Sequence, residues 1–249
     1  MLPFKFPFFF SVSSLFLAFF TPTPVAAGQF GVSPIRIDMN RSARSGAITV
    51  TNDAQAEPLR AQLRLFEWTQ DASGKDDYQL NEELLYFPRL MTLEQGEQKL
   101  VRVGLKMQTF EREKAYRLFI EELPAPPVAG GARVAIAVRF GVPIFVKPAV
   151  EDMRGSIEKL AIEKGVLRVG VRNEGNVHFT IRAITATSGE ALSKEVSGWY
   201  LLAGAAREHT IELPPQVCAK LKQIEVIVKA DPPLEIKGTL SVDGSSCGP

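Results

Sequence analysis

Short segments of alternating apolar and polar residues, separated by Gly, Pro, Asn and Asp, run through most of the chain. Successive side chains of a β-strand point to opposite faces, so this alternation predicts half-buried strands. Sustained helical periodicity is scarce, and only residues 152–159 suggest a short helical turn. Many short strands divided by turn residues are typical of antiparallel sandwiches. We therefore predict an all-β fold made of two immunoglobulin-like β-sandwich domains.

The predicted strands fall into two groups of similar size. The first group ends with the longest strand, Arg133 to Val146, which Lys147-Pro148 follows. We place the boundary there, so that residues 28–148 form an N-terminal domain and residues 149–249 a C-terminal domain. The expected strands cover 48–52, 59–67, 84–87, 98–105, 115–123 and 133–146, then 167–172, 177–186, 199–202, 209–213, 224–229 and 237–242.

The first 27 residues have the pattern of a secretory signal peptide. Lys5 precedes an apolar run from Phe8 to Phe20, and Val25-Ala26-Ala27 is a small-residue cleavage site. The run is shorter than the roughly 20 residues that span a bilayer. We expect residues 1–27 to be removed and the exported chain to begin near Gly28.

Charge and cysteine content limit the kinds of ligand that the protein is expected to bind. Lys and Arg number 29 and Asp and Glu 28, so the net charge gives no electrostatic reason to expect nucleic acid binding. The two cysteines, Cys218 and Cys247, are expected to form one disulfide in an exported protein. A metal site would need more ligands, and only His178 and His209 could be added. No metal or cofactor is expected.

Two short motifs resemble catalytic or nucleotide-binding signatures. Gly244 to Gly248 fits Gly-x-Ser-x-Gly, but no helix can follow it and no histidine comes after it. Gly74-Lys75 lacks the upstream glycine of a phosphate-binding loop. We therefore predict that the protein is not an enzyme.

The longest predicted strand is the most informative segment. Val134, Ile136, Val138 and Phe140 lie on one face of it, because side chains alternate. One interpretation is an ordinary core strand with a single buried face. The other is a strand whose apolar row is only partly covered by its own domain and is lent to a partner.

Taken together, these segments resemble the PapD-like pilus chaperones, especially the divergent branch that assembles archaic-type fimbriae. The resemblance covers residues 30–148, and is weaker afterwards, where Val171-Arg172-Asn173 and Leu201 to Gly204 are recognisable. No single fragment is specific, but their order and spacing are. The fragments that carry the match are Val32-Ser33-Pro34-Ile35-Arg36-Ile37, Glu57-Pro58-Leu59, Tyr116 to Pro124, Pro126-Pro127 with a Gly-rich loop, and Val142 to Pro148.

The resemblance implies an ATP-independent periplasmic chaperone with its two domains in an L shape. It implies pilus or fimbrial subunits and an outer-membrane usher as partners. In this family the subunit lacks its last strand, and the chaperone supplies an edge strand; chaperone–pilin complementation is itself a standard example of strand addition. The donor residues by position are Val134, Ile136 and Val138, with Phe140 as a further one. An uncovered apolar edge favours aggregation, so a self-capping dimer of the free chaperone is also implied.

One departure concerns the subunit's C-terminal carboxylate, which family members usually bind with two basic residues. Arg36 matches the first position, but the second falls on Pro143, which carries neither charge nor N–H. Arg139 shares the strand parity of Pro143, and Arg117 lies on another predicted strand of the same domain. Either arginine could supply the bidentate contact that suits a carboxylate.

The alternative function is a secreted immunoglobulin-like adhesin or structural fimbrial component, since fold alone does not fix function. A self-polymerising subunit would need an N-terminal donor extension of alternating apolar residues. Only Gly28 to Gly31 separates the predicted cleavage site from the first strand, so the chaperone is the expected function.

Overall fold

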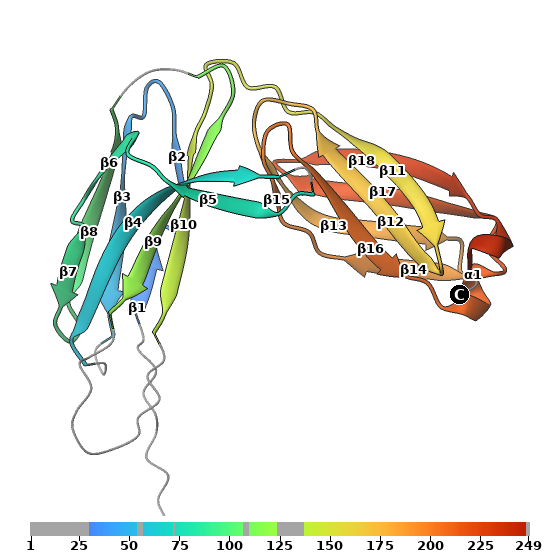
Figure 1. The fold of residues 1–249 in the computed structure, drawn as a ribbon, viewed down its shortest axis with the longest axis horizontal. Helices are drawn as coiled ribbons and strands as arrows, with labels where there is room; N and C mark the ends of the chain where they lie inside the picture. The colour runs from blue at the N-terminus through green and yellow to red at the C-terminus, as the bar shows by residue number, and fades with distance from the viewer. Residues whose placement is uncertain (1–29, 54–56, 72, 107–109, 124–136, 248–249) are drawn as a thin grey trace, which may run out of the picture.

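The computed structural model describes residues 30–53, 57–71, 73–106, 110–123 and 137–247. The predicted signal peptide, residues 1–27, lies outside the described residues, as do the predicted donor residues Val134 and Ile136. Two β-sandwiches follow one another along the chain and meet at an angle, giving the molecule a bent shape (Figure 1). The all-β, two-domain immunoglobulin-like fold predicted from the alternation is thus confirmed. No helix among these residues is long and apolar enough to cross a membrane.

Ten strands of the described residues form the first sandwich. One sheet has the order β1-β3-β8-β6, and the other has the order β2-β10-β9-β4-β5 with β7 paired to β4. The pairs are antiparallel except β2 with β10, which is parallel. The strands are β1 (Phe30–Ser33), β2 (Ile37–Met39), β3 (Ser45–Asn52), β4 (Leu59–Gln70), β5 (Asp76–Leu80), β6 (Leu84–Phe87), β7 (Leu90–Leu93), β8 (Gln98–Leu105), β9 (Lys114–Glu122) and β10 (Arg139–Val146).

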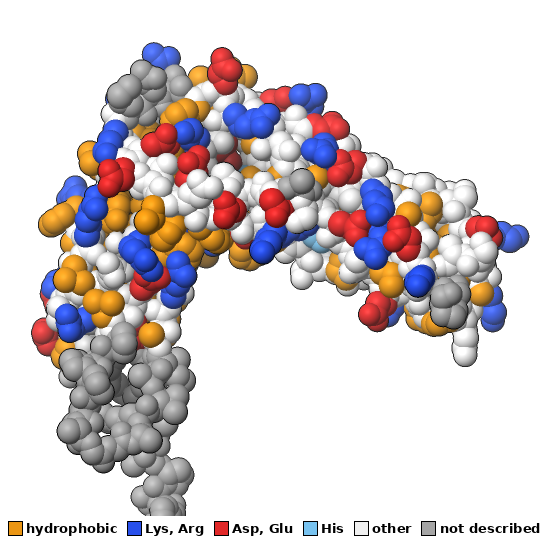
Figure 2. Space-filling view, in the orientation of Figure 1, with side chains coloured by type: hydrophobic (Ala, Val, Ile, Leu, Met, Phe, Trp, Pro, Cys, Tyr) orange, Lys and Arg blue, Asp and Glu red, His pale blue; other side chains and the backbone are white. Residues whose placement is uncertain are grey.

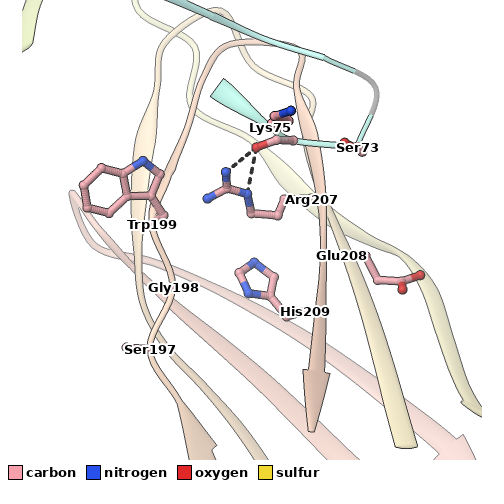
Figure 3. A pocket seen from close by; sticks show the side chains of 9 residues that line it. Ser73, Lys75, Ser197, Gly198, Trp199, Arg207, Glu208 and His209 are labelled. Atoms are coloured by element: carbon pink, nitrogen blue, oxygen red, sulfur yellow. Dashed lines mark hydrogen bonds between the residues drawn. The ribbon is translucent and has the colours of Figure 1, made fainter. Parts of the chain in front are cut away.

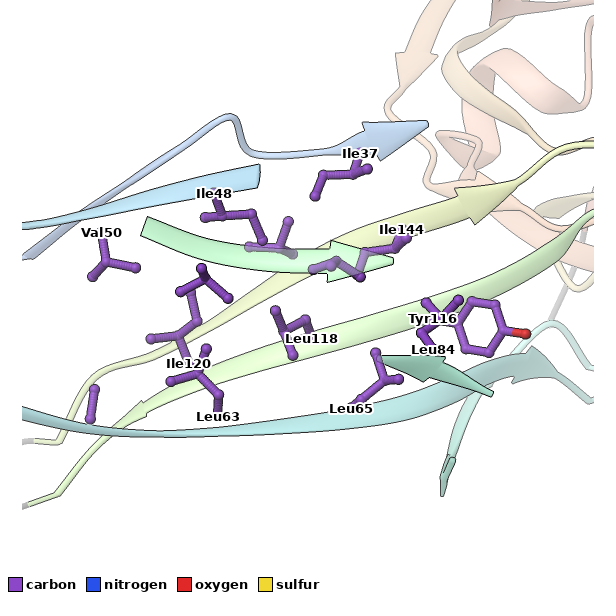
Figure 4. Packing of buried hydrophobic residues seen from close by; sticks show 14 of the residues in the cluster. Ile37, Ile48, Val50, Leu63, Leu65, Leu84, Tyr116, Leu118, Ile120 and Ile144 are labelled. Atoms are coloured by element: carbon purple, nitrogen blue, oxygen red, sulfur yellow. The ribbon is translucent and has the colours of Figure 1, made fainter. Parts of the chain in front are cut away.

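The core of this sandwich follows the alternation. On β4, Leu63 and Leu65 are buried while Arg64 between them is exposed. Figure 4 shows the side chains of Ile48, Leu118 and Ile144 meeting between the two sheets. Burying each such side chain is worth about 1.5–3 kcal/mol, so this shared interior holds the two sheets together.

The second sandwich has sheets of order β11-β12-β16 and β14-β13-β17-β18, with β15 paired to β13. A disulfide joins Cys218 and Cys247, whose Cα atoms are 5.7 Å apart, inside its core. The elements are β11 (Gly155–Glu163), β12 (Val166–Asn173), β13 (Phe179–Ser188), β14 (Leu192–Val196), β15 (Tyr200–Leu201), β16 (Ala206–Glu212), α1 (Pro215–Cys218), β17 (Gln223–Asp231), β18 (Leu234–Ser241) and the 3₁₀ turn η1 (Gly244–Cys247).

A buried contact joins the two sandwiches where β9 and β13 begin. The Glu113 Oε1 atom accepts the His178 backbone N–H at 3.0 Å and lies 2.7 Å from His178 Nδ1. The Phe145 ring stacks on the imidazole, with 3.5 Å between the ring centroids. Burial without solvent makes such polar contacts costly to break, so they fix the second sandwich against the ends of β9 and β10.

The β4–β5 hairpin makes a second contact, which we call the hairpin clasp (residues 70–76 with residues 199–207). Gln70 accepts the Leu202 backbone N–H through Oε1 at 2.9 Å and donates through Nε2 to the Tyr200 carbonyl at 2.9 Å. Arg207 Nε donates to the Gly74 carbonyl at 2.9 Å. The clasp therefore ties the tip of a first-domain hairpin to the backbone and side chains of the second domain.

Two local expectations differ from the structure. The helical turn predicted within residues 152–159 is wrong, because β11 covers Gly155–Glu163. A register shift between Ile157 and Lys159 breaks the period-2 pattern there, as expected of a β-bulge, and hid the strand from the sequence. The longest predicted strand, 133–146, is a strand from Arg139 onward, and residues 133–136 lie outside the described residues.

Candidate functional site

One edge of β10 has no partner strand over part of its length. β9 pairs with β10 from Arg139 to Val146, but on the opposite side β2 pairs only with Ile144 to Val146. Within the described residues, therefore, the segment from Arg139 to Pro143 has an uncovered edge. An uncovered edge presents backbone groups that can pair with another chain.

The hydrogen-bond pattern identifies which backbone groups face that edge. The Val138 carbonyl accepts the Glu122 N–H of β9, whereas the Lys147 N–H donates to the Met39 carbonyl of β2. Backbone groups of an antiparallel strand point alternately to its two sides. Those of Arg139, Gly141 and Pro143 therefore face away from β9. Pro143 has no N–H to lose, which is why proline is tolerated at this edge position.

The apolar side chains of β10 are buried at its C-terminal end and more exposed towards its N-terminal end. Val142 and Ile144 are buried in the first core, but Phe140 is 37% exposed, and its ring is held edge-on to Phe30 at 5.2 Å between centroids. Val138 is partly buried against the same core. Both described members of the predicted donor row thus lie where coverage by their own domain is incomplete.

Arg117 lies directly opposite Pro143 in the β9–β10 pair. Its side chain is buried, with only 8% of the residue exposed, and its guanidinium lies 4.0 Å from the centroid of the Trp68 ring. Nη1 donates to the Gly141 carbonyl at 3.4 Å, whereas Nε and Nη2 are buried and have no hydrogen-bond partner among the described residues. A buried charge normally has an ionic or hydrogen-bonded partner, so this fork is incomplete as it stands.

Gly141 makes room for this arrangement. A Cβ atom there would lie 2.8 Å from Phe119 Cε1 and 3.0 Å from Arg117 Cδ. The arginine therefore passes close over the strand where no side chain obstructs it. Sequence reasoning did not single out this glycine, although it stands on the face opposite the apolar row.

The other two candidate arginines have partners of their own. Arg139 Nε is 2.8 Å from Glu121 Oε1, and its guanidinium stacks 3.6 Å from the centroid of the Phe119 ring. Arg36 is exposed in the bend before β2, and its Nε is 2.9 Å from Asp38 Oδ2. Arg36 nevertheless directly precedes Ile37, the first residue of β2, which pairs with Ile144 on the side of β10 opposite β9.

Aromatic side chains that the sequence analysis did not predict enclose Arg117. Besides Trp68, the rings of Tyr78 and Trp199 have centroids 6.0 and 5.9 Å from its Cζ atom. Burial, and after it the neighbouring Asp76 carboxylate, raise the pKa of Tyr78 despite the opposing effect of Arg117. The phenol is therefore neutral and does not balance the guanidinium charge.

The described residues offer no metal site beside this edge. No group of three or more His, Cys, Asp and Glu residues suitable for a metal occurs among the described residues. On the face seen in Figure 2, basic and acidic side chains are interspersed. The arrangement can pair a backbone at the strand edge and bind an anion at the guanidinium.

A sequence model of the pili and flagellar-assembly chaperones, PapD N-terminal domain, matches residues 29–151. The N-terminal domain, residues 29–151, therefore belongs to the PapD-like pilus-assembly chaperones, a family of chaperones rather than enzymes, as the resemblance implied. The chaperones of this family are periplasmic. No sequence among the curated proteins matched the chain.

Solved structures with the same fold include three chaperones from different bacteria. The CsuC–CsuE chaperone–tip adhesion subunit complex of archaic Csu pili from Acinetobacter baumannii has 18% identity and a TM-score of 0.61, covering 84% of this chain and 98% of that one. The SafB chaperone in complex with SafA pilin from Salmonella enterica has 16% identity and a TM-score of 0.56, with 87% and 99% covered. The Pseudomonas aeruginosa CupB2 chaperone has 14% identity and a TM-score of 0.53, with 84% and 97% covered. At these identities the likeness establishes the fold.

Proposed function

We propose that this protein is a periplasmic chaperone that binds a pilus subunit by lending it the uncovered edge of β10. The observation that carries the proposal is the edge from Arg139 to Pro143, where backbone groups face outward and no strand of the described residues pairs with them. A subunit strand added there would gain main-chain hydrogen bonds that do not depend on its sequence.

Side chains of the apolar row would supply the rest of the affinity. Val134, Ile136, Val138 and Phe140 share the parity of the buried Val142. Burial of each in a subunit groove would contribute about 1.5–3 kcal/mol, enough for a few of them to hold a subunit that lacks a strand. The half-exposed Phe140 supports this, because coverage by the chaperone's own domain ends near it.

Arg117 is the residue we propose to bind the subunit's C-terminal carboxylate. Its Nε and Nη2 atoms have no partner in the described part of the chain, and together they form the side of a guanidinium that donates two hydrogen bonds to a carboxylate. Arg36, which precedes β2 on the other side of β10, would assist at the cost of its exposed pair with Asp38. Arg139 is the weakest of the three candidates, because its guanidinium already pairs with Glu121 and stacks on Phe119.

The remaining parts of the proposal concern location and further partners. Residues 1–27 would direct the chain to the periplasm as a cleaved signal peptide, and residues 28–148 and 149–249 would form the two domains. An outer-membrane usher would receive the loaded chaperone. In the free protein a second copy would cover the edge, giving a self-capping dimer.

Co-expression in the periplasm with the neighbouring candidate pilin genes tests the proposal. The wild type should yield a soluble one-to-one complex, and Ile136→Asp should lose it while staying folded, because a charge in an apolar groove costs several kcal/mol. Ala137→Asp is the matched control, since Ala137 has the opposite parity and is exposed. Equal recovery with Ile136→Asp and Ala137→Asp would reject the donor strand and favour the adhesin.

A further inference from the structure

The guanidinium fork of Arg117 is closed off from solvent in this structure. Nε and Nη2 are both fully buried, and no group of the residues that the structure describes forms a hydrogen bond with them. The proposed function requires these two atoms to reach a carboxylate, and the inference below rests on that function. Something must therefore move before the carboxylate can bind.

Three rings surround the guanidinium, and they differ in exposure. Trp68 lies beneath it in the junction between the domains and is only 1% exposed. Tyr78 belongs to the hairpin strand β5 and is partly buried. Trp199 comes from the second domain, just before β15, and is 41% exposed. Trp199 is thus the outermost of the three and the one that can move at least cost.

A small set of contacts holds Trp199 in place. Its Nε1 donates to Asp76 Oδ2 at 3.1 Å, and its ring packs edge-on to Tyr200 with 5.3 Å between centroids. Asp76 Oδ1 in turn accepts from Gln70 Nε2 at 2.9 Å. The position of Trp199 therefore depends on the same hairpin that ties the two domains together.

A hollow of about 430 Å³ opens beside Trp199, between the hairpin tip and β16. Figure 3 shows Trp199 on one side of it and Arg207 and His209 on the other. Its lining is completed by Ser73, Gly74, Lys75, Ser197, Gly198 and Glu208. The indole thus has open space next to it on the side of the hollow.

We infer that Trp199 is a lid, contributed by the second domain, that covers the Arg117 fork in the free chaperone and turns aside into this hollow when the subunit's C-terminal carboxylate binds. Occupation of the anchor is then coupled to the second domain through Asp76 and the hairpin clasp. The lid also keeps an unpaired guanidinium away from other anions until a subunit strand brings a carboxylate to the edge of β10.

Arginine modification by phenylglyoxal tests the lid without any subunit. Peptide mapping of the full exported chain gives the modification rate of Arg117. Trp199→Ala should raise that rate at least tenfold over wild type, and Trp199→Phe, which keeps a ring but loses the bond to Asp76, should raise it less. Phe87→Ala, at a remote and 75% exposed position, is the control and should change nothing. An unchanged rate in Trp199→Ala overturns the lid.

Subunit capture by co-expression shows whether Trp199 only covers Arg117 or itself contacts the bound subunit. Trp199→Ala should recover at least as much one-to-one complex as wild type, because removing a lid does not remove the anchor. Loss of the complex by a folded Trp199→Ala protein would make Trp199 a binding residue and overturn the inference. Arg117→Gln reports separately on the proposed function: if it captures subunits normally, the anchor fails, whereas the phenylglyoxal rates still decide whether Trp199 covers Arg117.

Discussion

Arg117 of β9 and Pro143 of β10 are direct cross-strand neighbours. Pro143 occupies the position where the resemblance to pilus chaperones leads one to expect the second basic residue. Because directly opposed residues point to the same face of a sheet, Arg117 places a cation on that face one strand away. A positive charge is thus retained beside the open edge, from a different strand.

The first prediction follows from this relationship. Arg117→Gln should reduce recovery of the soluble subunit complex about tenfold or more, since a hydrogen bond to a charged group contributes about 1.5–3 kcal/mol. Co-purification after periplasmic co-expression measures it. Arg139→Gln serves as the comparison and should cost less, because Arg139 is already paired with Glu121. A larger loss from Arg139→Gln than from Arg117→Gln would contradict the prediction and place the anchor on β10 instead of β9.

Gly74 should be essential for the hairpin clasp. It has a φ of +76°, and a Cβ atom there would lie 2.6 Å from the Ala206 carbonyl oxygen and 2.6 Å from Arg207 Cβ. Gly74→Ala should therefore loosen the docking of the two domains, detectable as a larger radius of gyration in X-ray scattering.

Gly189 provides the matched control for this prediction. It also has a positive φ, +53°, but an added Cβ would have no neighbour within 4 Å. Gly189→Ala should cost only the local strain, about 1–2 kcal/mol, and leave the radius of gyration unchanged. If both variants behave alike, the clasp does not hold the domains together.

Removing the disulfide should destabilise the second domain. Cys218 and Cys247 are 29 residues apart in sequence, and both are buried in its core. In the chain-entropy model a loop of this length contributes about 3–4 kcal/mol. The Cys218→Ser, Cys247→Ser double variant should therefore unfold at lower urea concentration than wild type. An unchanged urea midpoint would mean that the disulfide contributes nothing to the free energy of unfolding.

His209 should make the free energy of unfolding depend on pH. Burial, and after it the charge of Arg207, lower the pKa of His209 below the ordinary value of 6.5. As the pH falls through 6.5, the unfolded chain takes up a proton that the folded chain does not, so stability is lost towards lower pH. His209→Gln should lose less stability than wild type between pH 7.5 and 5.5 in urea unfolding. Equal losses would contradict the assignment.

Sequence patterns predicted the sandwich fold well because period-2 alternation reports directly on burial. The buried set Leu59, Ala61, Leu63 and Leu65 on β4 is the plain case. The same rule failed on β11, where a register shift interrupts the period. Alternation also could not reveal that Trp68 is buried. This residue lies on the face of β4 opposite the core, and the second domain covers it.

The site was only partly predictable for a similar reason. Arg117 could be named as a candidate because it lies on a predicted neighbouring strand, but its lack of an ionic partner depends on which side chains fold against it. Trp199 lies 82 positions after Arg117 in the sequence. No local spacing links the two, and only docking of the domains brings the indole to within 5.9 Å of the guanidinium.

Amide hydrogen exchange at the edge of β10 tests the central claim most directly. The N–H groups of Arg139 and Gly141 face the uncovered edge, whereas those of Phe140 and Val142 face β9. At dilutions where the free chaperone is a monomer, Arg139 and Gly141 should exchange fast. In the co-purified subunit complex both should become protected, while Phe140 and Val142 are protected in both states. If Arg139 and Gly141 exchange equally fast with and without the subunit, the chaperone does not lend this strand.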